Sequence, residues 1–544
     1  MFSKHTVVAL VVASVLSQSA LAAQSAEERS LSELRNTVVN LLQALVERGV
    51  LTREQAQAMV KNAQDKAAVD AAQVAAQDKA DEGAVRVPYV PEIVKEEIRK
   101  QVAADLAPQV AKEVVAQAQD EAWGVPGALP DWVKRMRWNG DVRVRGQGDL
   151  FAGDNVPNAE IEDRYVDFLT VNDRGGIGNA GVAAFLNTTE DRQRLRARMR
   201  LGFEAELGWG WVAGARLTTG NLRDPVSTNQ TLGNTGARYQ TGFDLAYAKW
   251  YGNSATGRHS LNAWGGRIPN PWLSTDLVWD PDLTFEGLAT NYRLGLSRDD
   301  PYSRFLFATV GAFPLQEVEL AGDKWFYGGQ LGIDWKLVSG SRARFGVAYY
   351  NYRNIAGRQN SLDSNLFDYT APQFMQRGNT VYDIRNDTNP NTNLFALAAD
   401  YELVDATLTY DWRLSADYRI GFTADYVKNI GYDQDTVFAR TGRQLEKRNN
   451  GYQGEINFGS SNMAQRGAWR AFVGYRYVER DAVLDAFTDS DFHLGGTDAE
   501  GYFIGGDYSF TPRVSARVRY LSANEIDGLP LGVDVLQLDL NTQF

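Results

Sequence analysis

Cysteine is absent from this chain of 544 residues, and histidine occurs only three times. Without cysteine there is no disulfide framework, no thiolate metal site and no thiol nucleophile. Histidine is the usual general base beside a nucleophile, but His5, His259 and His493 lie in no catalytic motif. These absences predict a protein that is not an enzyme and that holds no metal and no cofactor. A site built from aspartates in the loops stays open as a less favoured alternative.

The chain also lacks an excess of basic residues. Lys and Arg number 56 against 68 Asp and Glu, which gives a formal net charge of -12 at pH 7. Because no global basic field is available to hold a phosphate backbone, we expect no nucleic-acid partner.

Long apolar runs are missing after the amino terminus. No later segment approaches the roughly 20 apolar residues that a membrane-spanning helix needs, and the mean hydropathy is -0.36. This excludes a helical membrane protein. It does not exclude a transmembrane β-barrel, because every second residue of a barrel strand faces the lumen.

The amino terminus itself has the pattern of a secretory signal. Lys4 and His5 precede an apolar run from Thr6 to Leu16, and Ala20 and Ala22 then form an A-x-A cleavage site. The sequence therefore predicts a signal peptide over residues 1–22, cleaved after Ala22, and export from the cytoplasm.

Residues 23–130 have helical periodicity. Apolar residues recur at three- and four-residue steps, the spacing of a helix with one apolar seam, at Leu31, Leu34, Val38, Leu41 and Leu45. We expect a helical segment in the periplasm, and its apolar seam is compatible with a coiled coil. A solvated spacer, self-association through the leucine seam and capture of a periplasmic partner all fit this pattern.

From residue 138 onward the period changes to two, as in strands with one apolar and one polar face. The closing segment is typical, because Leu536, Leu538 and Leu540 alternate with polar residues and the chain ends on Phe544. An aromatic carboxy-terminal residue at the lipid interface favours an outer-membrane barrel over a soluble sandwich. We therefore predict an all-β transmembrane barrel over residues 131–544, with Phe544 as membrane anchor. Its sixteen or so antiparallel strands are expected near 138–150, 192–207, 211–220, 242–252, 259–267, 283–294, 303–313, 325–337, 342–353, 400–414, 417–428, 449–459, 467–480, 500–510, 512–523 and 532–544.

The connections between these strands alternate in length. Long segments such as 151–191, 221–241, 354–399, 429–448 and 481–499 take odd places, and short turns take even places. A barrel with both termini in the periplasm has this alternation, with short turns inside and long loops outside.

Arginines gather on one face of three predicted strands. An arginine on the lipid face costs roughly 2–4 kcal/mol at the midplane of the bilayer, so this face must be in water. The predicted lumen residues are Arg143, Arg145, Arg192, Arg194, Arg196, Arg198, Arg200, Arg513, Arg517 and Arg519. They favour anions, unless pairing with Glu204, Glu206 or other lumen carboxylates cancels their field.

The segment 268–282 is a candidate for a loop that folds inward and constricts the channel. Its prolines stiffen it, and Trp272 and Trp279 could pack against the wall, with Asp276 and Asp280 among the candidate constriction residues. An ordinary outer loop or an aromatic girdle at the membrane interface is the alternative interpretation.

Four stretches give the chain a resemblance to a known family. They are TVVNLLQALVERGVLTREQA from Thr37, GGRIPNPWLSTDLVWDPDLTFEG from Gly265, DYVKNIGYD from Asp425 and the closing strand. On these stretches the chain resembles the putative porins of Gram-negative bacteria, which carry a helical segment before the barrel. The resemblance implies a trimeric or monomeric diffusion channel and does not imply a substrate.

The sequence therefore predicts an outer-membrane porin that lets small hydrophilic solutes diffuse passively, with some anion preference. Its expected partners are outer-membrane lipid, small solutes, a second and third copy of the chain in a homotrimer, and a periplasmic partner of the helices. A barrel-anchored envelope tether or adhesin is the alternative, and a barrel enzyme is less favoured.

Overall fold

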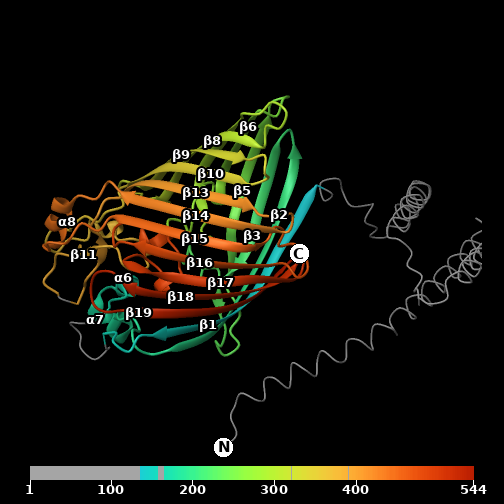
Figure 1. Ribbon diagram of the computed structural model, residues 1–544. Coiled ribbons are helices and arrows are strands. Elements are labelled where there is room, and N and C mark those ends of the chain that lie inside the picture. Colours follow the sequence, from blue (N-terminus) through green and yellow to red (C-terminus); the bar gives the residue numbers. More distant parts are fainter. Residues whose placement is uncertain (1–134, 157–164, 320, 390) are drawn as a thin grey trace, which may run out of the picture. The chain divides into compact units, whose positions relative to one another are not determined.

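The computed structural model describes residues 135–156, 165–319, 321–389 and 391–544. The predicted signal peptide (1–22) and helical segment (23–130) lie outside the described residues. Sixteen antiparallel strands form the wall of a closed β-barrel, as the periodicity predicts (Figure 1). No helix in the described ranges is long and apolar enough to cross a membrane.

Each predicted strand is present, and the observed ends lie within three residues of the predicted ones. The wall strands are β1 (Met136–Phe151), β2 (Arg192–Gly208), β3 (Trp211–Thr219), β5 (Thr241–Asn253), β6 (His259–Ile268), β7 (Phe285–Gly295), β8 (Arg304–Gln316), β9 (Lys324–Lys336), β10 (Arg342–Arg353), β13 (Glu402–Arg413), β14 (Tyr418–Asn429), β15 (Asn450–Ser460), β16 (Trp469–Val478), β17 (Ala499–Thr511), β18 (Val514–Glu525) and β19 (Gly532–Gln543).

Shorter elements lie in the connections. A two-residue strand, β4 (Gln230–Thr231), pairs with β2, and β11 (Val381–Asp383) pairs with β12 (Phe395–Leu397). The short helices are α6 (Phe168–Arg174), α7 (Ile177–Ala180), α8 (Gln434–Thr441), and the 3-10 turns η2 (Gly181–Ala184), η3 (Asp368–Thr370), η4 (Asp485–Phe487) and η5 (Phe492–Leu494).

The barrel closes where its first strand meets its last. β1 pairs with β2 on one side and with β19 on the other, so no edge strand is left with unpaired backbone groups. The terminal residue completes this seam, because the backbone N–H and C=O of Phe544 both bond to Gly140 at 3.0 Å.

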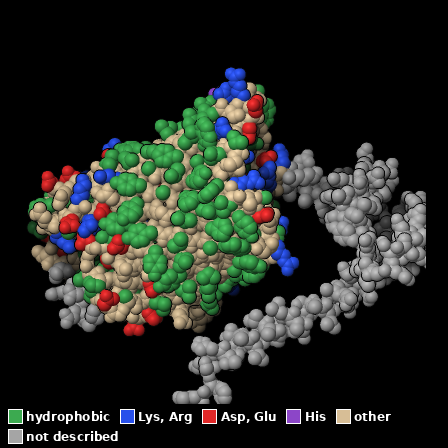
Figure 2. All heavy atoms as spheres, in the orientation of Figure 1, with side chains coloured by type: hydrophobic (Ala, Val, Ile, Leu, Met, Phe, Trp, Pro, Cys, Tyr) green, Lys and Arg blue, Asp and Glu red, His purple; other side chains and the backbone are tan. Residues whose placement is uncertain are grey.

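The two faces of the wall are sorted as the alternation predicts. Leu538 in β19 is 51% exposed, while its neighbour Gln537 is 1% exposed and points inward. Figure 2 shows hydrophobic side chains over the flank of the barrel and charged side chains gathered toward its two ends. An apolar outer band of this kind fits the hydrocarbon of a bilayer.

Exposed aromatic residues mark both rims of this band. Near one rim the hydroxyl groups of Tyr475 and Tyr520 bond to Glu500 and Asp534 at 2.9 and 2.7 Å. Near the other rim lie the exposed indoles of Trp211, Trp412 and Trp469. Amphipathic rings at both ends of an apolar band are typical of the two membrane–water interfaces.

The long connections share one end of the barrel, which we name the loop end, and the short turns share the other, the turn end. Figure 1 shows α6, α7, α8 and β11 together at the loop end and the carboxy terminus at the turn end. The connections 317–323 and 526–531 are short although they lie at the loop end. Two of the long ones do not stay outside, and they build the site.

Candidate functional site

The connection 269–284 between β6 and β7 lies inside the barrel, and we name it the inward segment. Near its start, Leu273 accepts a hydrogen bond from the side-chain amide of Gln330 in β9 at 2.7 Å. In its middle, Thr275 donates to Asp425 in β14 at 2.6 Å. Near its end, the Asp282 carboxylate lies 3.2 Å from Arg198 in β2. The segment therefore contacts widely separated parts of the inner wall.

Aromatic packing holds this segment against the wall. Trp279 is 2% exposed, and its ring centroid lies 5.0 to 5.2 Å from those of Phe285, Phe326 and Tyr350. Trp272 packs edge-on against Tyr350 at 5.3 Å. Both tryptophans thus lie inside the barrel and not in its lipid-facing rim. Burying aromatic surface here offsets the entropy lost in ordering the loop.

A second long connection, 479–498 between β16 and β17, packs beside the inward segment. The N–H of Asp280 donates to the carbonyl of Phe487 at 2.8 Å, and the N–H of Ser490 donates to the Asp280 carboxyl at 3.0 Å. The alternation of connection lengths predicts an outer loop for this connection. Its inward position depends on contacts with distant strands, and its sequence carries no local signal for them.

One buried arginine forms ion pairs with both segments. Arg476 in β16 is 1% exposed and forms ion pairs with Asp276 at 2.6 Å and with Asp489 at 2.8 Å. Its Nε also donates to the side-chain oxygen of Gln453 at 2.6 Å. A buried charge without a partner is costly, so this arrangement fixes both segments relative to the wall.

Most of the predicted lumen arginines are also paired. Asp141 lies between Arg198 and Arg200 at 2.8 and 2.7 Å, and Arg145 pairs with Asp539 at 2.7 Å and Asp491 at 2.9 Å. Arg194 pairs with Asp149, Arg517 pairs with Asp507, and Arg519 lies 3.6 Å from Asp276 and Asp489. The carboxylates that pair with these arginines therefore belong to aspartates of the barrel wall and of the two segments.

Glu204 and Glu206, the partners suggested by the sequence, do not serve this role. Glu204 accepts a hydrogen bond from Tyr247 at 2.7 Å, and Glu206 pairs with Arg137.

Two of the predicted lumen arginines differ from the others. Arg143 and Arg196 have no ion-pair partner among the residues that the structure describes. Arg143 donates to the side-chain oxygen of Asn229 at 2.6 Å, and Arg196 donates to Gln147 and Ser227 at 3.3 Å. The hydrogen-bond acceptors of these two arginines are therefore neutral oxygens.

The last two predicted arginines lie away from this cluster. Arg192 is exposed at the loop end of β2. Arg513 was expected on the lumen wall, and this prediction is wrong, because it is exposed in the turn before β18. The Thr511 hydroxyl accepts hydrogen bonds from the N–H groups of Arg513 and Val514 at 3.1 and 3.0 Å, which delays the start of the strand by two residues.

These groups surround a polar cavity of about 380 Å³ between the wall and the two segments. Its charged lining consists of Arg143, Arg145, Arg198, Arg200, Arg517, Arg519, Asp141, Asp276, Asp280, Asp282, Asp489, Asp491, Asp507 and Asp539. The two signs nearly balance, so the field in the cavity depends on the groups that lack a partner. Such a lining can select and pass hydrated ions and small polar solutes.

A family model described as "Putative porin" matches residues 35–544. The chain belongs to this family. No curated protein matches the chain at a significant level. Its membership and its closed barrel indicate an outer-membrane channel rather than an enzyme.

The fold of this porin is also similar to those of solved structures. The high-pH structure of OprB from Pseudomonas putida has 12% identity and a TM-score of 0.40, and covers 76% of this chain and 95% of that chain. The outer-membrane channel DcaP of Acinetobacter baumannii has 13% identity and a TM-score of 0.38, with 76% and 98% covered. OmpF of Salmonella typhi has 11% identity and a TM-score of 0.37, with 75% and 97% covered.

His259 and His493 lie in structural positions. His259 bonds to the Tyr292 hydroxyl at 2.6 Å near the turn end. His493 is buried, and its Nε2 lies 2.9 Å from the carbonyl oxygen of Leu531. In the described part of the chain no group of three His, Cys, Asp or Glu side chains is placed to hold a metal ion.

Two aspartates of the inward segment have pKa values that are shifted in opposite directions. Burial alone would raise the pKa of the Asp282 carboxyl, but Arg198, Arg143 and Arg200 outweigh it and hold this pKa below its ordinary value. Burial, with repulsion from Asp489 and Asp282, raises the pKa of Asp280 well above its ordinary value. The lowered pKa favours the charged form of Asp282, and the raised pKa favours the protonated form of Asp280.

We expect the 479–498 connection to open more readily as the pH rises. Burial, with repulsion from Asp481, raises the pKa of Asp485 to about 7, while the unfolded value is near 3.8. The proton therefore stabilises the packed connection fully below pH 4, and this contribution is lost as the pH rises through 7. Opening should increase roughly tenfold between pH 6 and pH 8 from Asp485 alone.

Hydrogen exchange of the amides around Asp485, corrected for the intrinsic rate, measures this opening. The variant Asp485→Asn should retain only a weaker pH dependence, since burial also raises the pKa of Asp498 to about 7 in the same connection. An opening equilibrium that stays flat in the unmodified protein between pH 6 and 8 contradicts the prediction.

Proposed function

We propose that this porin is a water-filled channel for the passive diffusion of small hydrophilic solutes across the outer membrane. The observation that carries the proposal is the charged cavity of about 380 Å³ inside a closed barrel of sixteen wall strands. A barrel of this size encloses an aqueous channel, and the two packed segments narrow it. Each barrel encloses its own lumen, so the same function is available to a monomer and to a homotrimer.

The proposed channel favours anions, and the preference comes from Arg143 and Arg196. Arg143 lines the cavity, while Arg196 lies in β2 outside the cavity lining. The arginines that line the cavity with Arg143 lie beside aspartates, so their fields largely cancel. These two are bonded to neutral oxygens, at Asn229 for Arg143 and at Gln147 and Ser227 for Arg196. Their charges therefore attract anions without a competing carboxylate in contact.

Single-channel recording in a planar bilayer tests both parts. Correctly inserted protein should give an ohmic current, and a gradient of KCl should give a reversal potential that favours chloride. Absence of current from inserted protein would falsify the pore. A current with a reversal potential that favours potassium would contradict the anion preference and leave the pore intact.

Replacing both unpaired arginines should move the selectivity toward cations. A unit charge about 4 Å from a passing ion contributes about 1 kcal/mol in water, so Arg143→Gln should lower the chloride-to-potassium permeability ratio roughly fivefold. Arg196→Gln should lower the ratio by less, because Arg196 does not line the cavity. The matched control is the pair Arg298→Gln and Arg466→Gln, which removes the same charge from exposed residues in the turns. An equal shift in the control would assign the preference to net charge and not to the lumen.

A further inference from the structure

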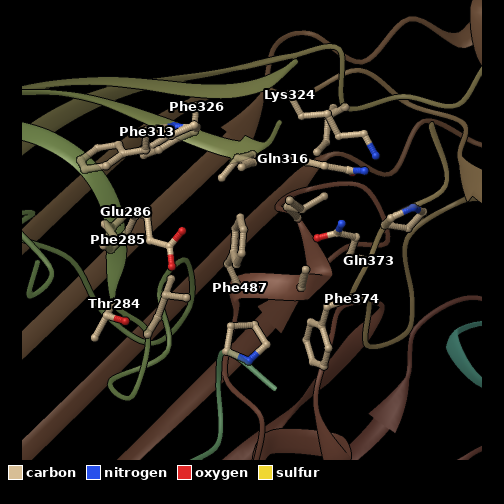
Figure 3. Close-up of a pocket in the computed structure, with 18 of the residues that line it drawn as sticks. Thr284, Phe285, Glu286, Phe313, Gln316, Lys324, Phe326, Gln373, Phe374 and Phe487 are labelled. Atoms are coloured by element: carbon tan, nitrogen blue, oxygen red, sulfur yellow. The ribbon is translucent and has the colours of Figure 1, made fainter. Parts of the chain in front are cut away.

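A second cavity, of about 620 Å³, lies at the loop end of the barrel, and its chemistry differs from that of the lumen. The ends of β7, β8 and β9 supply Phe285, Phe313 and Phe326 to it, and η4 supplies Phe487. Phe285 and Phe326 lie with their ring centroids 5.1 and 5.4 Å from that of Phe313. Figure 3 shows these rings around the cavity, with Phe374 at one side.

An apolar cavity is not what passive diffusion of hydrophilic solutes requires. Apolar surface that faces water costs about 25 cal/mol per Å² relative to being covered. The cavity lies within the 300–1,000 Å³ that small-molecule sites commonly occupy, and such sites are mostly apolar with a few placed polar groups. Its aromatic lining therefore points to a ligand with an apolar body.

One polar group of the cavity has an unused binding capacity. Lys324, the first residue of β9, is 3% exposed, and its Nζ donates to the carbonyl oxygens of Thr370 and Ala371, each at 3.1 Å. An ammonium group has three donors, and no ion pair of Lys324 is present in the described ranges. Buried charges are normally paired, so the Lys324 ammonium group is a buried charge without an anionic partner in the described residues.

The other charged groups around the cavity do not supply that anion. Glu286 pairs with Arg267 at 2.9 Å. Arg223 pairs with Asp173 at 2.8 Å, outside the lining. Asp485 lines the cavity and forms no ion pair in the described part of the chain. Burial, with Asp481, raises its pKa to about 7, so much of it is protonated at neutral pH.

Figure 3 groups Lys324 with the amide side chains of Gln316 and Gln373 on one side of the cavity, and places Phe285, Phe313 and Phe326 away from them. A ligand that satisfies both sides has an apolar body at one end and an anion at the other. A carboxylate also accepts hydrogen bonds from the two amide groups.

We propose that this cavity is a binding site for aryl-substituted monocarboxylates, with the carboxylate on Lys324 and the aromatic body against Phe313, Phe326 and Phe487. This inference rests on the proposed channel function and adds a substrate class to it. The site lies beside the diffusion path, because Leu283 and Thr284 of the inward segment line it and Asp282 of the same segment lines the polar cavity. A carboxylate that leaves Lys324 next meets the arginines of the lumen.

The test uses the whole chain and the probe 3-phenylpropionate, with its neutral amide as the matched ligand. Calorimetry on detergent-solubilised protein should show the carboxylate binding about tenfold more tightly than the amide, as expected for a hydrogen bond to a charged group. In planar bilayers the same probe, added at the loop side, should interrupt the current in proportion to its concentration, while the amide should not.

The variant Lys324→Met should bind the carboxylate and the amide equally weakly, and Phe487→Ala should weaken both ligands by a similar factor. The control Lys336→Met removes the exposed lysine at the other end of the same strand and should leave binding unchanged. The comparison of two ligands on the unmodified protein needs no variant, so misfolding of Lys324→Met does not remove the test.

The outcomes separate the two proposals. A conducting protein that binds neither ligand, or binds both equally, overturns the carboxylate site and leaves the channel function standing. A protein that gives no current but prefers the carboxylate in calorimetry supports the site and overturns the channel.

Discussion

Replacing Arg476 by methionine should destabilise the barrel by about 3–5 kcal/mol and enlarge its current, because it breaks a buried pair by removing one partner. Methionine keeps much of the length of the side chain but leaves Asp276 and Asp489 without the cation that lies 2.6 and 2.8 Å from them. Their repulsion should push the inward segment and the 479–498 connection apart, and the constriction should widen.

The unfolding free energy in lipid vesicles and the single-channel conductance measure the two effects. Arg470→Met is the matched control, since Arg470 lies on the same face of β16 and pairs with Asp507 at 2.6 Å. Asp507 keeps Arg517 as a partner, and this pair touches neither segment. The control should therefore cost less than about 1 kcal/mol and leave the current unchanged. A normal current in Arg476→Met would show that the two segments are held without this arginine.

Placing an arginine on the outer face of β15 should cost about 2–4 kcal/mol of unfolding free energy. Ile456 is 50% exposed and lies between Phe422 and Val473, which are also exposed and apolar. If this face is in hydrocarbon, Ile456→Arg buries a charge there without a partner. Unfolding by urea from lipid vesicles gives the value.

The neighbouring residue supplies the control for this prediction. Asn457 faces the lumen and its amide bonds to Glu455 at 3.2 Å, so Asn457→Arg places the same side chain in water beside a carboxylate. The Asn457→Arg substitution should leave the unfolding free energy nearly unchanged. Equal costs for the two variants would show that the outer face is not in lipid, and would remove the basis for a transmembrane barrel.

The strands are the part of the fold that the sequence predicts best. The period of two predicts each of the sixteen strands to within three residues, and the exposure of side chains along β2 and β19 alternates as this period requires. Alternation is a local property, because neighbouring side chains of a strand point to opposite faces whatever the rest of the chain does. The ends of strands are less local, and the turn formed at Thr511 moved Arg513 out of the wall.

The site was predicted only in part. The segment 268–282 predicts Trp272, Asp276, Trp279 and Asp280 as candidate constriction residues, with an outer loop or an interfacial girdle as the alternative. The 479–498 connection and the cavity at Lys324 were missed. Both depend on contacts between residues far apart in the chain, such as Asp280 with Phe487. No short sequence motif indicates such contacts.

The sequence by itself determined which residues face lipid and which face the lumen, because lipid and water impose a period of two on every strand. Only the tertiary structure decided which charges cancel. Arg145 and Asp539 are 394 residues apart and meet because the barrel closes, while Arg143 and Arg196 meet no carboxylate in the described chain. Ion pairing depends on distances of a few ångströms between strands and loops, and the order of residues along the chain does not contain those distances.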